Sequence, residues 1–250
     1  MSLILTDIHQ RICTITFNRP EKKNAFNRSG WFALRDAVVE ARNNDAVSVV
    51  VITGAGKDFS SGVDLSDLTG EPGEKPPFEV MMDEMMLLDK PLLAAAKGVA
   101  IGFGATALFH CDVVYVGESL RMRLPFVNLG LVPEAGCSYT LPRNIGYQQA
   151  AELLFTAEWI NAERAIETGI ARRVFSDDEL LPKTLEKAVE MAQWPRNALR
   201  ETKRTLMQAH TAAINQAREL EMAGMMRQVG SAENIEAVTA FLEKRAPRFD

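Results

Sequence analysis

Apolar residues follow two different periods along this chain, one typical of strands and one typical of helices. Residues 11–17 alternate in polarity and are followed by Pro20, which predicts a strand that ends in a turn. Between 29 and 43, apolar residues recur at helical spacing. The β-branched run 47–53 then predicts a second strand, apolar on both faces as in a parallel sheet covered by helices. This order of elements predicts an α/β fold.

After residue 90 the pattern predicts further strands and one helix, and beyond about residue 146 it predicts mainly helices. Residues 91–96 and 113–116 predict two more strands, and residues 105–109 between them favour a helix. The Gly- and Pro-rich stretch 69–77 predicts a loop, which we expect to act as a mobile flap over a site. Beyond about residue 146 the helical period dominates, with helices expected at 148–155, 162–168, 178–191, 198–226 and 233–244.

Composition and charge exclude several classes of function. A net charge of -5, with no block of Lys and Arg among aromatic residues, argues against a nucleic-acid partner. No stretch approaches the roughly 20 apolar residues that span a bilayer. The first eleven residues carry neither a secretory signal nor a transit peptide. We therefore expect a cytoplasmic protein without a membrane partner.

The cysteines and histidines give little support to a metal site or a nucleophile. Cys13, Cys111 and Cys137 are an odd number at wide spacing, which favours buried reduced thiols over disulfides or metal ligands. His110 precedes Cys111 directly, and neighbours in sequence point to different faces of a helix or strand. A catalytic Cys–His pair is therefore disfavoured, and no metal is expected.

Two glycine-rich elements carry the candidate chemistry. In the segment 59–65, Gly62 permits a backbone geometry that aims neighbouring N–H groups at a ligand. In the segment 98–104, Gly102 precedes Phe103 where a helix is expected to begin, and the free N–H groups of a helix N-terminus favour negative charge. Tight packing of backbone is the alternative for either element alone. Together, two N–H donors from separate loops predict an oxyanion hole.

These elements belong to a larger set that resembles the crotonase superfamily, the enoyl-CoA hydratases and isomerases. The resemblance covers essentially the full chain. It implies a crotonase-like spiral of ββα turns over about 1–193, followed by a C-terminal helical trimerisation region over 194–250. It also implies an acyl-CoA substrate, no cofactor beyond the coenzyme A of the thioester, and a homotrimer or hexamer. The motifs stand in the family's order at 18–25, 59–65, 98–104, 129–133 and 241–245.

Carried over by position, the resemblance implies that the N–H groups of Val63 and Phe103 bind the thioester oxygen. The family often has Gly where this chain has Phe103, and we expect the ring to narrow the acyl pocket. Coenzyme A is expected to lie against Lys22, Lys23, Ala25, Ser61, Gly62, Asp64 and Leu65. The two lysines could equally be solvated surface residues. Further substrate contacts are expected at Thr106, Phe126, Leu129, Phe241 and Lys244, of which the last two are expected to touch the nucleotide from a neighbouring subunit.

The acidic residues indicate which reaction is catalysed. The family's hydratases use two glutamates to activate water, and this chain has Thr106 and Phe126 at those positions. Glu134 instead matches the base of the peroxisomal-type Δ3,Δ2-enoyl-CoA isomerases. One carboxylate suffices to move a proton from C2 to C4 of a dienolate. We therefore predict an isomerase with Glu134 as base, and a hydratase as the alternative.

Other interpretations remain open. Glu134 could simply be an acidic residue favoured at a helix N-terminus. Residues 102–107 fit the G-x-G-x-x-A pattern of dinucleotide binding, but no acidic residue follows about 20 positions later. The segment 54–58 is similar to a phosphate loop, yet Asp58 stands where Ser or Thr must hold magnesium. A non-catalytic CoA-binding protein is the last alternative.

Overall fold

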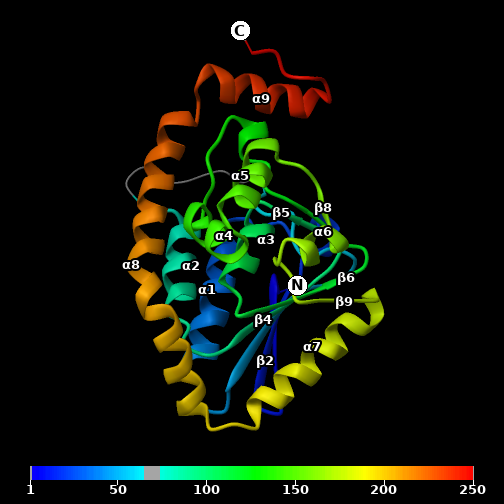
Figure 1. Cartoon of the computed structure of the whole chain (residues 1–250), viewed down its shortest axis with the longest axis vertical. Coiled ribbons are helices and arrows are strands. Elements are labelled where there is room, and N and C mark those ends of the chain that lie inside the picture. Colours follow the sequence, from blue (N-terminus) through cyan, green and yellow to red (C-terminus); the bar gives the residue numbers. More distant parts are fainter. Residues whose placement is uncertain (1, 65–73, 250) are drawn as a thin grey trace.

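The computed structural model describes residues 2–64 and 74–249, and Figure 1 shows the path of the chain. Leu65 and most of the expected flap at 69–77 lie outside the described residues. Two sheets form the framework. The larger has the strand order β1-β2-β3-β4-β6-β9 and the smaller has the order β5-β7-β8. The larger sheet comprises β1 (Ile4–His9), β2 (Ile12–Phe17), β3 (Val49–Gly54), β4 (Leu92–Ala96), β6 (Val113–Gly117) and β9 (Arg173–Phe175).

The larger sheet is parallel except at β1, which pairs antiparallel with β2. The smaller sheet contains β5 (Val99–Ile101), β7 (Arg121–Arg123) and β8 (Ile160–Asn161). Because β4 and β5 are separated by only two residues, the chain steps from one sheet into the other at Gly98. Its φ of +57° and the main chain of Lys57, 2.1 Å from where a Cβ would stand, leave room only for glycine.

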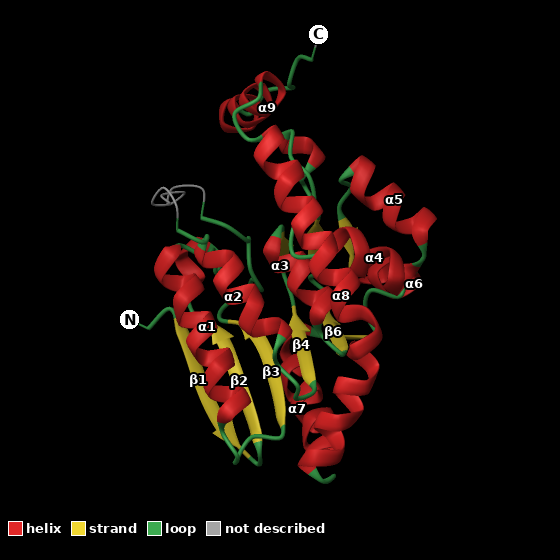
Figure 2. Ribbon diagram, turned by 90° about the vertical axis from the view of Figure 1, so that its left-hand side faces the viewer, coloured by secondary structure: helices red, strands yellow, loops and turns green. Residues whose placement is uncertain are grey.

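Helices cover both faces of the larger sheet, as Figure 2 shows on the side of α1 (Arg28–Asn43) and α2 (Pro77–Met86). Val50 and Ile52 of β3 belong to the core cluster that includes buried residues of α1 and α2. Val49 of the same strand packs with Ala188 of α7 (Asp177–Ala192) on the opposite face. This alternation explains why Val49, Val50, Val51 and Ile52 are all apolar, and it confirms that helices cover both faces of the sheet.

The expected helices of the second half are confirmed within a few residues. They are α5 (Tyr147–Thr156), α6 (Ala162–Glu167), α7, α8 (Arg196–Gln228) and α9 (Ala232–Glu243). Figure 1 shows α8 running along one side of the molecule and α9 crossing its end. The expectation of helices alone beyond residue 146 is wrong, because β8 and β9 lie among them. Both strands are too short to carry a pattern of period two.

Shorter elements complete the fold. The expected helix at 105–109 is confirmed as α3 (Phe103–Thr106), continued by the 3₁₀ turn η2 (Ala107–His110). The sequence pattern does not predict β1, β5, β7, α2 or α4 (Cys137–Ile145). Two further 3₁₀ turns are η1 (Pro20–Lys22) and η3 (Val127–Leu129). No described helix has the combination of length and apolar surface needed to cross a membrane.

A buried lysine fixes α8 to the sheet. Lys203 is 8% exposed, and its Nζ donates to the main-chain oxygen of Lys90 at 2.9 Å and to Asp112 Oδ2 at 2.8 Å. The same Asp112 oxygen accepts from the N–H of Leu92 in β4 at 2.7 Å. A buried charge with these partners resists displacement, because removing either side leaves the other unsatisfied. The start of α8 is thereby held against β4.

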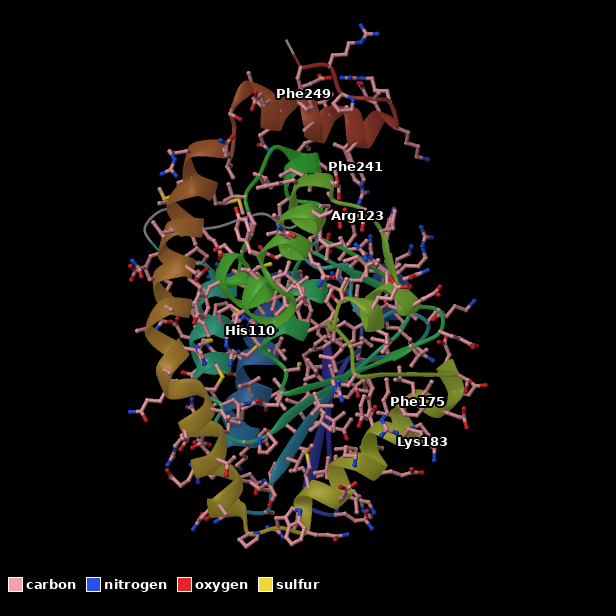
Figure 3. All side chains as sticks on the ribbon, viewed as in Figure 1. His110, Arg123, Phe175, Lys183, Phe241 and Phe249 are labelled. Carbon is pink, nitrogen blue, oxygen red and sulfur yellow. The ribbon has the colours of Figure 1, made fainter. Side chains whose placement is uncertain are left out.

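Lys203→Met should lower the free energy of unfolding by about 1–3 kcal/mol, since it removes both hydrogen bonds from a buried position. Chemical denaturation measures this value. Lys183→Met is the control, because Lys183 pairs with Glu186 on the surface of α7 and its side chain is 40% exposed (Figure 3). This control should change stability by less than about 0.5 kcal/mol. Equal losses in the two variants would contradict the anchoring role.

Candidate active site

The amide of Val63 is directed away from its neighbouring strand-like segment. Residues 26 and 63 form an isolated parallel bridge, in which Phe26 N–H donates to Gly62 O and Asp64 N–H donates to Phe26 O, both at 2.8 Å. In such a bridge the N–H of the residue between the two bonds points to the other side. Among the described residues, the Val63 amide donates to no main-chain acceptor.

The amide of Phe103 is the second free donor. Gly102 has φ +55° and ψ -121°, a conformation that glycine adopts readily and other residues avoid. Its carbonyl accepts from Ala105 and Thr106, both at 2.9 Å, and so starts α3. Phe103 is the first residue of this helix and has no acceptor within it. Its N–H donates to no other described main-chain group.

The segments that carry the two amides lie against each other at Gly62. A Cβ added to Gly62 would lie 2.6 Å from Ile101 O and 3.3 Å from Phe103 N. The residue also has φ +83°. Gly62 therefore allows an approach that any side chain would prevent. This approach brings the segments that carry the two donors together, and an oxyanion hole formed by both stays a prediction.

The ring of Phe103 packs in a cluster of aromatic side chains. It is fully buried, and its centroid lies 4.8 Å from the Trp31 ring, 5.4 Å from Phe26 and 5.8 Å from Phe78. All three contacts are edge-on, a favourable arrangement of aromatic pairs. The ring is therefore directed into the core beside α1 and α2, and the expectation that it narrows an acyl pocket stays a prediction. It anchors the loop that carries the second amide.

Most residues expected to hold coenzyme A lie together beside the first amide. Ser61 N–H donates to Lys23 O at 2.9 Å, which joins the first motif to the second. Lys22 and Lys23 are exposed, so their charged ends are free to reach a nucleotide or the solvent. Ala25 and Asp64 are connected through Arg19, whose Nη1 lies 3.2 Å from Ala25 O and 2.6 Å from Asp64 Oδ2.

Two residues that the sequence analysis did not single out hold this region in place. Arg19 is one of them, through the bonds just described. The buried Asn24, with φ +56°, donates from Nδ2 to Ala55 O at 3.0 Å and to Asp58 O at 2.7 Å. Both residues belong to the motif at 18–25, but only the folded chain shows that they join it to the segment 55–64.

The remaining expected contacts are spread over the molecule. Thr106 and Phe126 are buried, Thr106 in α3 and Phe126 just before η3. Leu129 O accepts from Asn234 Nδ2 at 2.6 Å, so η3 is the support on which α9 rests. Phe241 and Lys244 lie exposed at the far end of α9, and Figure 3 shows Phe241 well away from His110 in the centre of the molecule. The structure does not bring these two to the amides of the same chain through any described contact.

Glu134 reaches the second amide from another direction. A Cβ added to Gly102 would stand 3.9 Å from Glu134 Oε1, which places the carboxyl group beside the Gly102–Phe103 peptide. The residue precedes α4 in the turn that follows η3. No described group donates a hydrogen bond to this carboxyl. One carboxylate therefore faces the candidate oxyanion hole without a fixed partner of its own.

The surroundings of Glu134 favour its protonated form. Burial raises the pKa of Glu134 to about 8, and the negative charges of Glu221 and Glu79 act in the same direction. Such a group binds and releases a proton near neutral pH, as a general base requires. Within the described residues, no cluster of His, Cys, Asp and Glu side chains is arranged to hold a metal ion.

Comparison with known proteins identifies the family to which this geometry belongs. The family model described as enoyl-CoA hydratase/isomerase matches residues 7–250. The chain belongs to the enoyl-CoA hydratase/isomerase family. It is therefore an enzyme of the crotonase superfamily that acts on an acyl-CoA. The crystal structure of an enoyl-CoA hydratase/isomerase from Pseudoalteromonas atlantica T6c superposes with a TM-score of 0.95 at 35% identity, covering 99% of this chain and 100% of that one.

Two relatives from Escherichia coli K12 represent the range of reactions in the family. The 2,3-dehydroadipyl-CoA hydratase is 32% identical over 100% of this chain and 99% of its own length. The 1,2-epoxyphenylacetyl-CoA isomerase is 31% identical over 100% of this chain and 98% of its own length. The family thus gives the acyl-CoA substrate and the crotonase fold. The closer likeness to peroxisomal-type isomerases stays a prediction.

Gly62→Ala should lower kcat/KM by about 10²–10³-fold, because its Cβ would displace the loop and separate two amides that must act together. Steady-state kinetics on an acyl-CoA substrate provides the measurement. Gly169→Ala is a matched control, since Gly169 has a similar φ of +86° and nothing within 4 Å of an added Cβ. It should lose about 1 kcal/mol of stability and keep its turnover. Equal activity in the two variants would contradict the oxyanion hole.

Proposed function

We propose that this enzyme shifts the double bond of a 3-enoyl-CoA to give the 2-enoyl-CoA. In this Δ3,Δ2-enoyl-CoA isomerase reaction, the thioester oxygen lies between the amides of Val63 and Phe103. The Glu134 carboxylate removes a proton from C2, and the electrons move into a dienolate whose oxygen carries the negative charge. The carboxylic acid of Glu134 then returns the proton to C4, so atoms and charge balance without water.

The observation that carries this proposal is the single carboxyl beside the Gly102–Phe103 peptide. Glu134 Oε1 lies 3.9 Å from the position of a Gly102 Cβ, next to one of the two free amides. Thr106 and Phe126 occupy the two positions at which the family's hydratases hold their glutamates. Neither side chain is ionisable. A reaction that needs one base which also acts as an acid suits this site.

The raised pKa of Glu134 supports the same chemistry. A base with a pKa of about 8 removes the proton more readily than an ordinary carboxylate and still returns it at neutral pH. The carboxyl group of Glu134 has no hydrogen-bond partner among the described residues, so it can follow the proton from C2 to C4.

The same proposal includes the remaining contacts with the substrate and the assembly. Coenzyme A is held by the motifs at 18–25 and 59–65. The end of α9 completes the binding site for its nucleotide. We further propose two structural units divided near residue 193, a cytoplasmic location, and a homotrimer or hexamer. The proposed contacts with coenzyme A are Lys22, Lys23, Ala25, Ser61, Gly62, Asp64, Leu65, Phe241 and Lys244, and those with the acyl part are Thr106, Phe126 and Leu129.

Hydration of a 2-enoyl-CoA is the second candidate. It is favoured by the similarity to the 2,3-dehydroadipyl-CoA hydratase, which is slightly more identical to this chain than the isomerase relative. Hydration needs a base for the water and an acid for the α-carbon, and Glu134 alone would have to supply both. The two reactions have different substrates and are separated by direct assay.

Glu134→Gln should lower isomerisation of 3-hexenoyl-CoA to 2-hexenoyl-CoA by at least about 10³-fold, because the amide cannot accept the proton. Affinity for the acyl-CoA should change little, since the oxyanion hole and the coenzyme A contacts remain. Product formation is followed by chromatography, with crotonyl-CoA hydration measured in parallel.

Glu163→Gln on exposed α6 is the control for that substitution, because it makes the same chemical change far from the amides. It should retain full activity. Unchanged isomerisation in Glu134→Gln would remove Glu134 as the base. Rapid hydration by the wild-type enzyme with no isomerisation would replace the first candidate by the second.

The pH dependence of kcat/KM should report the ionisation of Glu134. The reactive form is the carboxylate, whose fraction grows as pH rises through the pKa of about 8. We expect kcat/KM for isomerisation to rise about tenfold per pH unit below this value and to level off above it. A profile that is already flat from pH 5.5 would show that the carboxyl has an ordinary pKa in the working enzyme.

A further inference from the structure

Glu134 is the first residue of a tight turn in an uncommon conformation. Cys137 N–H donates to Glu134 O at 3.0 Å and closes the turn. The two residues between them, Ala135 and Gly136, both have positive φ, +62° and +73°. For Ala135 this left-handed conformation is unfavourable because of its Cβ. Contacts from outside the turn must therefore hold it in this shape.

One such contact comes from α8. Glu221 is 7% exposed, and it accepts from Gly136 N–H at Oε2 (2.6 Å) and from Ser138 N–H at Oε1 (2.7 Å). These amides belong to the N-terminus of α4, which has no capping side chain of its own. A carboxylate in this place also interacts favourably with the helix dipole. A Cβ on Gly136 would lie 2.9 Å from Ile214 Cγ2, so α8 presses closely on the turn.

The second contact comes from the segment that carries the Phe103 amide. His110 ends η2, which continues α3 without a break from Phe103. Its Nε2 lies 2.7 Å from Ala135 O, and because a carbonyl oxygen only accepts, Nε2 carries the proton. Burial lowers the pKa of His110 to about 4, so the ring is neutral at physiological pH. Figure 3 shows His110 in the interior, near α8.

We propose that His110 and Glu221 are positioning residues that together fix Glu134 relative to the oxyanion hole. His110 joins the segment 103–110 to the turn 134–138, and Glu221 holds the same turn from α8. We call these two residues and this turn the base clasp. The inference rests on the proposed function, in which Glu134 is the base. Neither residue touches the substrate in this proposal, and each acts through the main chain of the turn.

Besides holding the turn in place, Glu221 affects the proton affinity of Glu134 through its charge. Burial raises the pKa of Glu221, and its two amide hydrogen bonds oppose this by favouring the ionised form, whereas the carboxyl of Glu134 receives no described hydrogen bond. The nearby negative charge of Glu221 then raises the proton affinity of Glu134. Other ionisable groups in this region, from α2, α4, α8 and η2, are Glu79, Asp83, Cys137, Arg218 and His110. Arg218 donates from Nη2 to Glu79 and Asp83, so its charge is largely satisfied by them.

The role of His110 is tested by three variants at that position. His110→Leu removes the donor and should lower kcat about 10–100-fold with little change in KM, because the base is misplaced while substrate contacts remain. His110→Gln can place an amide N–H near the position of Nε2, and should restore most of the lost turnover. Should His110→Leu not fold, His110→Asn takes its place, since its amide is too short to reach Ala135 O.

His9→Leu, at the exposed end of β1, is the control for loss of a histidine and should behave as wild type. Thermal melting and acyl-CoA affinity are recorded for every variant to separate misplacement of the base from unfolding. The clasp is contradicted if His110→Gln is as impaired as His110→Leu or His110→Asn. It is equally contradicted if loss of the donor leaves kcat unchanged.

The role of Glu221 is tested by a pair of variants that separates charge from reach. Glu221→Gln removes the charge and should lower the pKa of Glu134 by at least about one unit. Glu221→Asp keeps the charge on a shorter side chain, and should lower kcat while the pKa of Glu134 stays raised. The pKa is read from the carboxyl resonance of ¹³C-labelled glutamate in the enzyme without substrate, assigned by its absence in Glu134→Gln. Glu219→Gln, exposed on the same helix, is the matched control.

This titration needs no turnover, so the two proposals can fail separately. If Glu134→Gln keeps isomerising while Glu221→Gln lowers the pKa of Glu134, the proposed base is wrong and the effect of Glu221 on that carboxyl stands. If Glu134→Gln is inactive while the pKa of Glu134 is the same in wild type, Glu221→Gln and Glu219→Gln, the base stands and the role of Glu221 is refuted.

Discussion

Two main-chain N–H groups that are left without main-chain acceptors constrain much of this architecture. An unpaired amide is costly where water is excluded, so a fold keeps one only where the surrounding backbone prevents it from pairing. At Val63, the bonds on either side of the residue turn its N–H away from the bridge with residue 26. At Phe103, the start of a helix removes the acceptor. The glycines at 62 and 102 have positive φ, and Gly62 permits the two segments that carry these amides to approach closely.

The carboxyl beside these amides shows how stability and reactivity oppose one another. Glu134 binds its proton more tightly in the folded chain than in the unfolded one, with a pKa of about 8 against an ordinary 4.5. Its contribution to stability is therefore complete below about pH 4.5 and is lost progressively as pH rises through 8. The ionised form that would act as a base is the form that the fold tolerates least. Local strain at Ala135 adds to this cost.

The sequence predicted the elements whose burial repeats with a clear period. The strand β2, the helix α1 and the strand β3 are of this kind, since each presents a regular apolar face to the core. The strand β1 was missed because only Ile4 is buried, while Leu5 and Ile8 are exposed by 46% and 40%. The helix α4 was missed because Gly136 precedes its first residue and Pro142 lies within it, and both residue types usually mark the end of a helix.

The candidate site was predictable where function depends on local backbone geometry and unpredictable where it depends on distant contacts. Glycines at 62 and 102 identify free amides without knowledge of the fold. Nothing near Glu134 in sequence indicates Glu221, because 85 residues separate Gly136 from that side chain. The aromatic packing of the Phe103 ring was unpredictable for a related reason. Its partners Trp31 and Phe78 come from two helices that only the folded chain brings together.

The length of α8 has a consequence for any change near the end of the chain. With 33 residues the helix is a stiff rod of about 50 Å. Lys203 fastens one portion of this rod to the sheet, Glu221 meets the turn of Glu134 further along, and α9 follows directly after it. A neighbouring copy or a truncation could displace α9. Less than two turns of α8 separate Glu221 from the end of that helix, so such a displacement would reach Glu221 and the turn that it holds. In the proposed trimer or hexamer, subunit contacts made by α9 and the position of the proposed base would therefore depend on the same helix.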